Sequence, residues 1–372
     1  MKLTIFKSYM PSLYFTSLKK RGFAVDLKGR SGHGKTYTIE MFPIVMKALF
    51  LDKNYGLVVI EGASLNPSNA QGYMWPEDTA FGKASFFTNP YWMYTREGKH
   101  ISEYDGGIIL VDDWHLIDRD MKKYLSQGAY EGHLANHDFR KFNWVMWFAG
   151  NRPEDRAGAT ADFDHTINRQ DRVDISDDPE GMVQSLKDLG CMPVTWEWAE
   201  KFNQKYIYVP PPAVQGPFCT PRSLAASDSF LQIQKELYEM EEVPCDANIM
   251  EFVTGSLGKA AGNEYITYIR EYNALPPYAE IIKNPREVKM PPEDRPDLWR
   301  LQAYNLAHDV QVKHGNQAIL YMSRFPREFQ TVFVRAAIAN SSRIMFEPKF
   351  REWMSQNSAM IAALSGLEEA AE

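Results

Sequence analysis

Eight consecutive residues, 29–36, have the composition and spacing of a loop that binds phosphate. They are Gly-Arg-Ser-Gly-His-Gly-Lys-Thr and match the pattern G-x-x-x-x-G-K-[ST]. The glycines let the backbone fold so that its N–H groups converge on a phosphate, and the helix expected next adds its positive N-terminal end. Lys35 would contact the outer phosphates, and the Thr36 hydroxyl would bind Mg²⁺. The remaining residues expected to line the loop are Gly29, Arg30, Ser31, Gly32, His33 and Gly34.

A glycine-rich surface turn is the alternative explanation for this segment. The surrounding sequence argues against it, because an apolar strand (23–28) is expected before the loop and a long helix (36–51) after it. Strand, glycine-rich loop and helix in this order are typical of a nucleotide site. The loop therefore predicts that the chain binds a nucleotide.

Polar residues follow two other apolar segments at the point where each predicted strand ends. Residues 107–111 (GIILV) precede Asp112 and Asp113, and residues 144–149 (WVMWFA) precede Gly150 and Asn151. The carboxyl ends of parallel strands share one edge of a sheet, so these side chains are expected beside the phosphate loop. Asp112 would bind Mg²⁺, directly or through water, Asp113 would orient the attacking water, and Asn151 would hold that water. A solvated acidic turn and a turn-capping asparagine are the alternatives.

Short, continuously apolar segments alternate with helical patterns through the first half of the chain. This alternation predicts an α/β core, a parallel sheet covered by helices on both faces. After residue 176 the strand signals stop, and prolines in 209–217 and 285–296 interrupt a series of helices. We predict a core at 1–175, a helical lid at 176–285, and a helical C-terminal extension at 286–372 whose acidic end (366–372) frays. The predicted strands are 23–28, 56–60, 107–111, 144–149 and 173–175; the predicted helices are 36–51, 179–189, 194–205, 222–240, 262–273, 297–314 and 327–339.

Length and composition restrict the class of protein. A chain of 372 residues predicts two or three domains, and 44% hydrophobic with 24% charged residues is an ordinary globular composition. The net charge of −7 disfavours a protein that coats nucleic acid, although a local basic loop could still contact phosphate. Cys191, Cys219 and Cys245 are odd in number and far apart, so neither a disulfide framework nor a zinc site is expected. With no apolar run of membrane-spanning length and no secretory leader, a cytoplasmic location is expected, in the host if a phage encodes the chain.

The chain resembles the AAA+ ATPases in the order of its features. These are the phosphate loop, the acidic strand end, the strand that ends in asparagine, and then two arginines. The resemblance is to the MoxR-like branch found in bacteria and their phages, and it covers roughly residues 20 to 285. Four further segments resemble parts of that family: 65–72 (LNPSNAQG), 150–158 (GNRPEDRAG), 220–223 (TPRS) and 255–264 (GSLGKAAGNE). The resemblance implies Mg²⁺-dependent ATP hydrolysis by a ring-forming oligomer, most often a hexamer.

The resemblance also implies roles for individual residues. Asn151 matches the family's first sensor residue, and Arg222 matches the second, which reaches the γ-phosphate from the lid. Arg172, just before the fifth expected strand, matches the arginine finger given to a neighbouring subunit, with Arg169 as the second candidate. The family usually has glutamate where this chain has Asp113, which is one methylene shorter, so slower or assembly-dependent hydrolysis is expected.

Several functions remain open at this stage. The leading hypothesis is a motor or chaperone that remodels a protein target, and such ATPases often work with a protein carrying a von Willebrand factor A domain. The alternatives are a nucleic-acid-linked ATPase, such as a helicase loader or phage replication or transcription factor, and a scaffolding ring with weak turnover. Aromatic residues between the second and third strands could grip a polypeptide or stack on bases, but packing on their own domain or on a neighbouring subunit is favoured. They are Trp75, Phe81, Phe86, Phe87, Tyr91, Trp92 and Tyr94. His115 is expected to pack or form hydrogen bonds at a helix entrance.

Overall fold

The chain divides into two compact units. The computed structural model describes residues 1–21, 23–152, 155, 167–212 and 214–357. The first unit comprises Met1–Met182, Tyr208–Ala213 and Thr220–Arg222, and the second comprises Val183–Ile207, Val214–Cys219 and Ser223–Glu372. The acidic end at 366–372 and most of residues 153–158 lie outside the described residues, and the boundaries of the three predicted domains stay predictions. No helix in the described part of the chain is long and apolar enough to cross a membrane.

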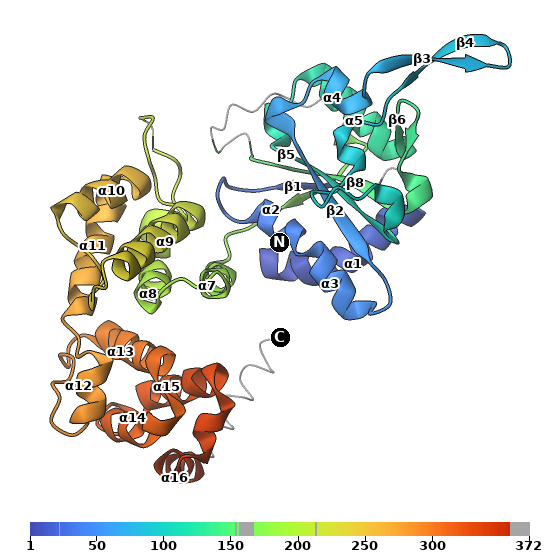
Figure 1. The fold of residues 1–372 in the computed structure, drawn as a ribbon. Coiled ribbons are helices and arrows are strands. Elements are labelled where there is room, and N and C mark those ends of the chain that lie inside the picture. Colours follow the sequence, from blue (N-terminus) through green and yellow to red (C-terminus); the bar gives the residue numbers. More distant parts are fainter. Residues whose placement is uncertain (22, 153–154, 156–166, 213, 358–372) are drawn as a thin grey trace. The chain divides into compact units, whose positions relative to one another are not determined.

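A five-stranded parallel sheet forms the centre of the first unit (Figure 1). Its strands are β1 (Val25–Lys28), β2 (Tyr55–Glu61), β5 (Gly106–Asp112), β8 (Trp144–Gly150) and β9 (Asp171–Asp174). They are arranged in the order β2-β5-β8-β1-β9, so β1 lies between β8 and β9. The predicted strands are all present, and the expected α/β class with a parallel sheet and a helical second half is confirmed. β9 begins at Asp171 rather than at residue 173, which places Arg172 inside the strand.

Helices cover both faces of this sheet, and each face has its own apolar core. On one face Leu27, Leu110 and Trp147 pack with Phe6, Met10 and Phe42. Alternate residues on the same strands, including Val111, Met146 and Phe148, point to the other face and pack with Trp114 and Leu125. The first-unit helices are α1 (Leu3–Lys19), α2 (Lys35–Glu40), α3 (Phe42–Leu49), α4 (Pro67–Gln71) and α5 (Arg119–Glu131).

The single helix predicted at 36–51 is wrong, because the structure has α2 and α3 in its place. The two helices meet at Met41, and Pro43 lies at the start of α3. Proline has no N–H to donate and its ring crowds the preceding turn, so the helix ends and restarts there. The helix that follows the phosphate loop is therefore only six residues long.

An exposed hairpin was not among the predicted strands. β3 (Met74–Thr79) pairs antiparallel with β4 (Gly82–Phe87), and nearly every residue of both strands is exposed. Figure 1 shows the hairpin projecting from the first unit beyond α4. The aromatic residues of this region divide into two groups. Trp92 is fully buried and its Nε1 donates to the Ala70 carbonyl at 2.9 Å, whereas Trp75 and Phe81 are exposed to solvent on the hairpin.

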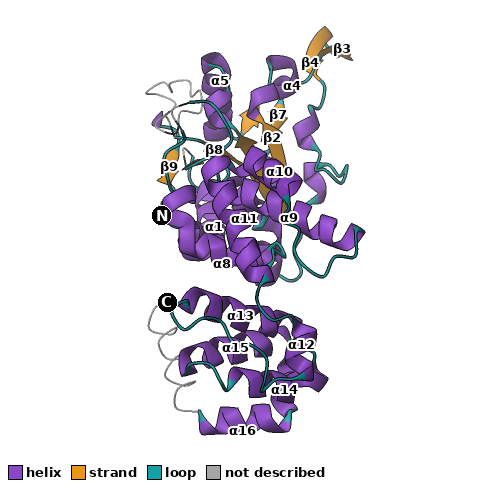
Figure 2. Cartoon of the chain, turned by 90° about the vertical axis from the view of Figure 1, so that its left-hand side faces the viewer, coloured by secondary structure: helices purple, strands orange, loops and turns teal. Residues whose placement is uncertain are grey.

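The second unit is helical, and no strand occurs in its described residues (Figure 2). An apolar core holds α12 to α16 together, with Trp299, Phe333 and Phe350 among its buried members. α7 (Pro179–Asp188) spans the junction of the two units. The second-unit helices are α8 (Pro193–Phe202), continued by a π-helical turn (Asn203–Ile207), α9 (Pro221–Leu237), α10 (Ala247–Leu257), α11 (Lys259–Asn273), α12 (Tyr278–Lys283), α13 (Pro296–Asp309), α14 (Gly315–Met322), α15 (Arg327–Asn340) and α16 (Pro348–Gln356).

Ion pairs join α8 to α13 inside the second unit. Arg300 lies 3.3 Å from the carboxylate of Glu197 and also contacts Glu200, while Lys201 lies 2.7 Å from Asp297. Glu197 is only 4% exposed. Burial raises the pKa of Glu197 to about 7, although the positive charge of Arg300 opposes that shift. The folded second unit therefore holds a proton on this carboxyl under conditions in which an unfolded chain would release it.

We expect the stability of the second unit to fall between about pH 4.5 and pH 7 because of Glu197. The pKa in the folded state, about 7, lies above the ordinary value of 4.5, so the contribution is complete below pH 4.5 and lost as the pH rises to 7. The loss is at most about 3.5 kcal/mol, because the pKa rises from 4.5 to about 7 on folding and each tenfold change in proton affinity corresponds to about 1.4 kcal/mol. Denaturation of wild type and Glu197→Gln across this range measures it, with Glu200→Gln as a control that contacts the same arginine. Equal pH profiles for all three proteins would contradict the expectation.

Candidate functional site

The glycine-rich loop between β1 and α2 requires glycine at two positions. Gly32 and Gly34 have φ angles of +74° and +85°, which residues with a Cβ rarely adopt. A Cβ on Gly32 would also lie 2.8 Å from the Thr220 hydroxyl oxygen. The backbone N of Arg222 donates to the Gly32 carbonyl at 3.3 Å, so the turn at the start of α9 contacts the loop directly. Successive N–H groups in such a loop form a concave site for anions.

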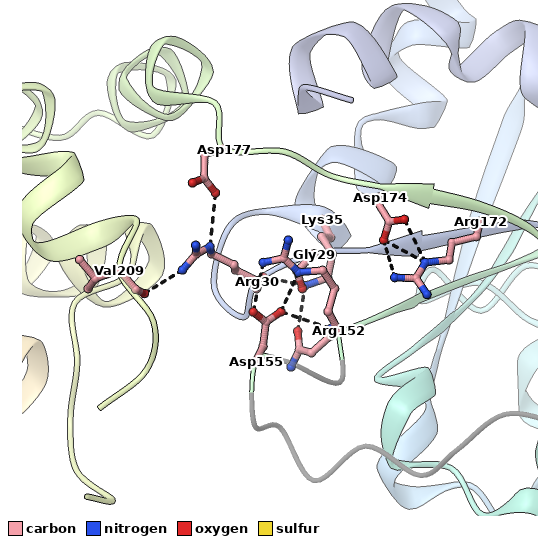
Figure 3. A network of polar contacts seen from close by, with 10 residues as sticks. Gly29, Arg30, Lys35, Arg152, Asp155, Arg172, Asp174, Asp177 and Val209 are labelled. Carbon is pink, nitrogen blue, oxygen red and sulfur yellow. Dashed lines mark hydrogen bonds and ion pairs between the residues drawn. The ribbon is translucent and has the colours of Figure 1, made fainter. Parts of the chain in front are cut away.

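Lys35 lies inside this loop and is nearly buried. Its Nζ donates to the carbonyl oxygens of Gly29 and Arg30, both at 2.8 Å, and to Oδ1 of Asn151 at 2.9 Å. Figure 3 shows Lys35 beside Gly29 and Arg30 of the loop. Burial lowers the pKa of Lys35 to about 8, and the negative charge of Asp112 opposes that shift. The three oxygens that accept from the ammonium group are neutral, so an anionic phosphate is a stronger partner for it.

Thr36 and Asp112 meet at the edge of the sheet. The Thr36 hydroxyl donates to Oδ2 of Asp112 at 2.6 Å, although the two residues are 76 positions apart in the sequence. Oδ1 of Asp112 accepts from the backbone N of Asp113 at 2.9 Å, which fixes the carboxylate against the end of β5. A hydroxyl and a carboxylate oxygen are the hard ligands that Mg²⁺ prefers, so the residues present fit this ion.

The chain turns sharply after Asp112. Asp113 has φ 49° and ψ 37°, a left-handed conformation that is uncommon for a residue other than glycine, and its side chain is exposed. This turn directs Trp114 into the core, where its ring centroid lies 4.3 Å from that of Phe148. Strained backbone of this kind is often found at functional sites. The Asp113 carboxylate remains next to Asp112 and accessible to water.

His115 was not predicted as a site residue, but it contacts Asn151 twice. The Asn151 backbone N lies 3.2 Å from Nδ1 of the imidazole, and the side-chain Nδ2 lies 3.2 Å from Nε2. His115 is almost fully buried, and burial lowers its pKa. The only signal in the sequence was its position three residues after Asp112, where a small polar residue is more common in the family that the chain resembles.

Other charged groups surround the loop. Arg152 holds Asp155 through its backbone N and guanidinium, with distances of 3.1 to 3.2 Å. Arg30 donates to the Val209 carbonyl at 2.8 Å and lies 3.3 Å from Asp177 (Figure 3). Burial lowers the pKa of His33 to about 4, and the positive charge of Arg30 adds to this effect. His33 is therefore neutral at pH 7, and Ser31 is exposed at the surface of the loop.

The predicted arginines lie at three different places. Arg222 is exposed at the start of α9, and its positive charge helps to lower the pKa of Lys35. Arg172 is exposed on β9, where its Nη2 donates to Asp174 at 2.7 Å; Figure 3 shows this pair apart from the contacts of Lys35. Arg169 precedes β9, and its guanidinium lies 5.7 Å from the centre of the Tyr130 ring. The structure thus brings Lys35, Thr36, Asp112 and Asn151 together, but not Arg169 or Arg172.

The chain has an α/β fold, with a five-stranded parallel sheet and the glycine-rich loop between β1 and α2. No protein-family model and no curated protein matches it. Similar solved structures include NtrX from Brucella abortus, with a TM-score of 0.35, 11% identity, and coverage of 89% of this chain and 68% of that one. NtrX in complex with ADP has a TM-score of 0.36 and 11% identity, covering 90% and 67%. The P216G mutant of Thermotoga maritima RuvB has a TM-score of 0.37 and 9% identity, covering 77% and 79%. At such low TM-scores, these similarities indicate nothing about what the site binds.

Proposed function

We propose that the chain binds ATP with Mg²⁺ at this loop and hydrolyses it, as an AAA+ ATPase of the MoxR-like branch. The observation that carries the proposal is the meeting of four predicted residues. Thr36 contacts Asp112 at 2.6 Å, and Lys35 contacts Asn151 at 2.9 Å, so the loop is joined to the ends of β5 and β8. Phosphoryl transfer needs such positioned charge more than covalent chemistry. Measurement of ATP binding and phosphate release, with and without Mg²⁺, tests the proposal directly.

Each residue has a separate role in this proposal. Lys35 and the loop N–H groups bind the phosphates, while Thr36 and Asp112 hold Mg²⁺, which neutralises charge on the phosphates. Asp113 and Asn151 orient the attacking water. Arg222 links the start of α9 to the γ-phosphate, and Arg172 or Arg169 serves the site of a neighbouring subunit.

Replacing Asp112 with asparagine is expected to remove the Mg²⁺ dependence of turnover and lower the rate by about a hundredfold or more. Asparagine keeps the shape and can still accept from Thr36, but it carries no charge for the ion. Asp113→Asn is the matched comparison, because it changes the neighbouring carboxylate and should lower turnover while Mg²⁺-dependent nucleotide binding persists. Titration of Mg²⁺ in both variants measures the difference. A Mg²⁺ dependence in Asp112→Asn equal to that of wild type would show that another residue holds the ion.

We favour the remodelling of a protein target as the function, carried out by a ring of subunits and driven by ATP turnover. The exposed β3–β4 hairpin supports this choice, since Trp75 and Phe81 offer apolar contacts to a polypeptide. The hairpin carries two acidic residues, Glu77 and Asp78, and one basic residue, Lys83. This negative balance of charge disfavours binding of a nucleic-acid backbone at this surface. A protein with a von Willebrand factor A domain is the partner suggested by the family resemblance. Turnover stimulated by single-stranded or duplex DNA, with salt-sensitive binding, would instead favour the nucleic-acid-linked ATPase.

The proposed domain organisation is the predicted one, with a core at 1–175, a lid at 176–285 and an extension at 286–372. The oligomer, most simply a hexamer, and its place in the cytoplasm belong to the same proposal. Sedimentation of the protein with and without ATP measures the oligomeric state.

A further inference from the structure

The start of α9 holds the peptide bond between Gly32 and His33 in the phosphate loop. The Gly32 carbonyl oxygen accepts from the backbone N of Arg222 at 3.3 Å. Pro221 is the first residue of α9 and has no N–H, so the N–H of Arg222 is the first donor of the helix. The first N–H groups of a helix have no acceptor inside it and need one elsewhere. For Arg222 that acceptor is a carbonyl of the loop.

Two side-chain contacts restrain the same peptide. A Cβ on Gly32 would lie 2.8 Å from the Thr220 hydroxyl oxygen and 2.9 Å from the Thr220 Cβ, so Thr220 lies directly against the Gly32 backbone. The His33 ring lies 5.2 Å from the buried Tyr208 ring, measured between centroids. The hydrogen bond from Arg222 is long, and this packing at both ends of the peptide adds to its effect. All of these residues belong to the first unit.

The direction of the Gly32 carbonyl determines the direction of the next N–H group. In a trans peptide the C=O and N–H bonds point in opposite directions, and no described residue of this chain has a cis peptide. Because the Gly32 oxygen points to Arg222, the His33 N–H points away from the start of α9. The positive φ angles of Gly32 and Gly34 bring the neighbouring N–H groups toward one concave site.

We infer that Thr220 and Arg222 are positioning residues for phosphate binding, and that Arg222 acts through its backbone N–H in addition to its guanidinium. Together they hold the 32–33 peptide so that the His33 N–H is already directed at the phosphate before nucleotide binds. A donor that is oriented in advance avoids the cost of ordering on binding. The inference rests on the proposed function for the identity of the anion, but the orientation of the peptide does not depend on it.

A pair of substitutions at one position separates the backbone N–H from the side chain. Arg222→Ala removes the guanidinium and keeps the N–H, whereas Arg222→Pro removes both. Proline is tolerated in the first turn of a helix, where its missing N–H breaks no bond of the helix. Ser68→Pro is the matched control, because Ser68 is exposed and follows Pro67 at the start of α4, so it creates the same pair of prolines.

The Kd for ATP is the first measurement. We expect it to be about tenfold or more higher in Arg222→Pro than in Arg222→Ala, the effect of misplacing one hydrogen bond to a charged group. The kcat values of these two variants should differ by less than about threefold, since both lack the guanidinium. Ser68→Pro should bind ATP as wild type does. Equal Kd values in folded Arg222→Ala and Arg222→Pro would overturn the positioning role of the backbone N–H.

The orientation of the peptide can be measured without nucleotide. The ¹⁵N relaxation order parameter of the His33 N–H reports its motion on the picosecond to nanosecond timescale. We expect it to fall in Arg222→Pro and in Thr220→Gly, and to equal that of wild type in Arg222→Ala. Thr220→Ser keeps both atoms that lie against Gly32 and should also match wild type, and glycine is tolerated at the start of a helix. Thr220→Gly therefore tests the restraint even where Arg222→Pro does not fold.

The outcomes separate this inference from the proposed function. Wild-type protein that binds no ATP would refute the proposed function, and the order parameters would still decide whether the start of α9 restrains the peptide. An order parameter of the His33 N–H that is unchanged in both Thr220→Gly and folded Arg222→Pro would refute the restraint. ATP hydrolysis by wild type together with that result would leave the proposed function intact.

Discussion

Replacing Lys35 with alanine is expected to abolish ATP binding and to reduce turnover by about a thousandfold or more. The ammonium lies at the centre of the glycine-rich loop, where it is the donor to Gly29, Arg30 and Asn151. Without it, the loop loses the positive charge that would pair with a phosphate, and the three oxygen atoms lose their donor. Binding of a fluorescent ATP analogue and phosphate release measure the two effects.

The same substitution is also expected to cost some stability, which the sequence did not indicate. The sequence predicted a contact of Lys35 with the outer phosphates, but the side chain is also only 7% exposed and joins the loop to the residue that follows β8. Loss of these contacts should lower the free energy of unfolding by about 1–3 kcal/mol. Lys47→Ala, which removes an exposed lysine of α3, is the matched control for both measurements. ATP affinity equal to wild type in folded Lys35→Ala would refute the assignment of the loop.

Contacts that depend on sheet topology could be predicted from the sequence. Thr36 and Asp112 are far apart in the chain, but both follow an apolar strand, and parallel strands place their carboxyl ends at one edge. Asn151 was placed by the same argument at the end of β8. Continuous apolar segments identified these strands because a sheet covered on both faces buries every residue.

The remaining features depend on contacts that no local pattern reveals. His115 meets Asn151 because Trp114 packs in the core and the backbone turns at Asp113, and neither event follows from residue spacing. The hairpin of β3 and β4 was missed for a different reason. Its strands are exposed on both faces, so they lack the alternation of apolar and polar residues by which a half-buried strand is recognised.

Helix α1 was not among the predicted helices, although the spacing of its apolar residues indicates a helix. Phe6, Met10 and Tyr14 are spaced four residues apart and are all fully buried on one face of the sheet. That spacing is typical of an amphipathic helix. The position of the helix against the sheet, on the face that holds Trp147, follows only from the folded structure.

Mixing two inactive variants is expected to restore part of the activity, if an arginine from one subunit serves the site of the next. Arg172→Ala keeps Lys35 and the whole loop but donates no arginine, whereas Lys35→Ala lacks the phosphate contact but still donates one. Each variant alone should lose about a thousandfold in turnover, the order of magnitude that an arginine finger contributes. Co-assembled mixtures contain interfaces where an intact loop meets an intact arginine, and only those interfaces should hydrolyse ATP.

The same experiment also decides between the two arginines. Arg172 is exposed on β9 with its guanidinium bound to Asp174, and Arg169 is half-buried before the strand with its guanidinium against the Tyr130 ring. Mixtures of Lys35→Ala with Arg172→Ala and with Arg169→Ala are compared at several ratios, and turnover per subunit of wild type should rise with protein concentration. The arginine that acts in trans gives an inactive single variant that Lys35→Ala rescues, whereas the other gives a nearly active one. Confirmed co-assembly without recovery in either mixture would exclude both arginines as a residue shared between subunits.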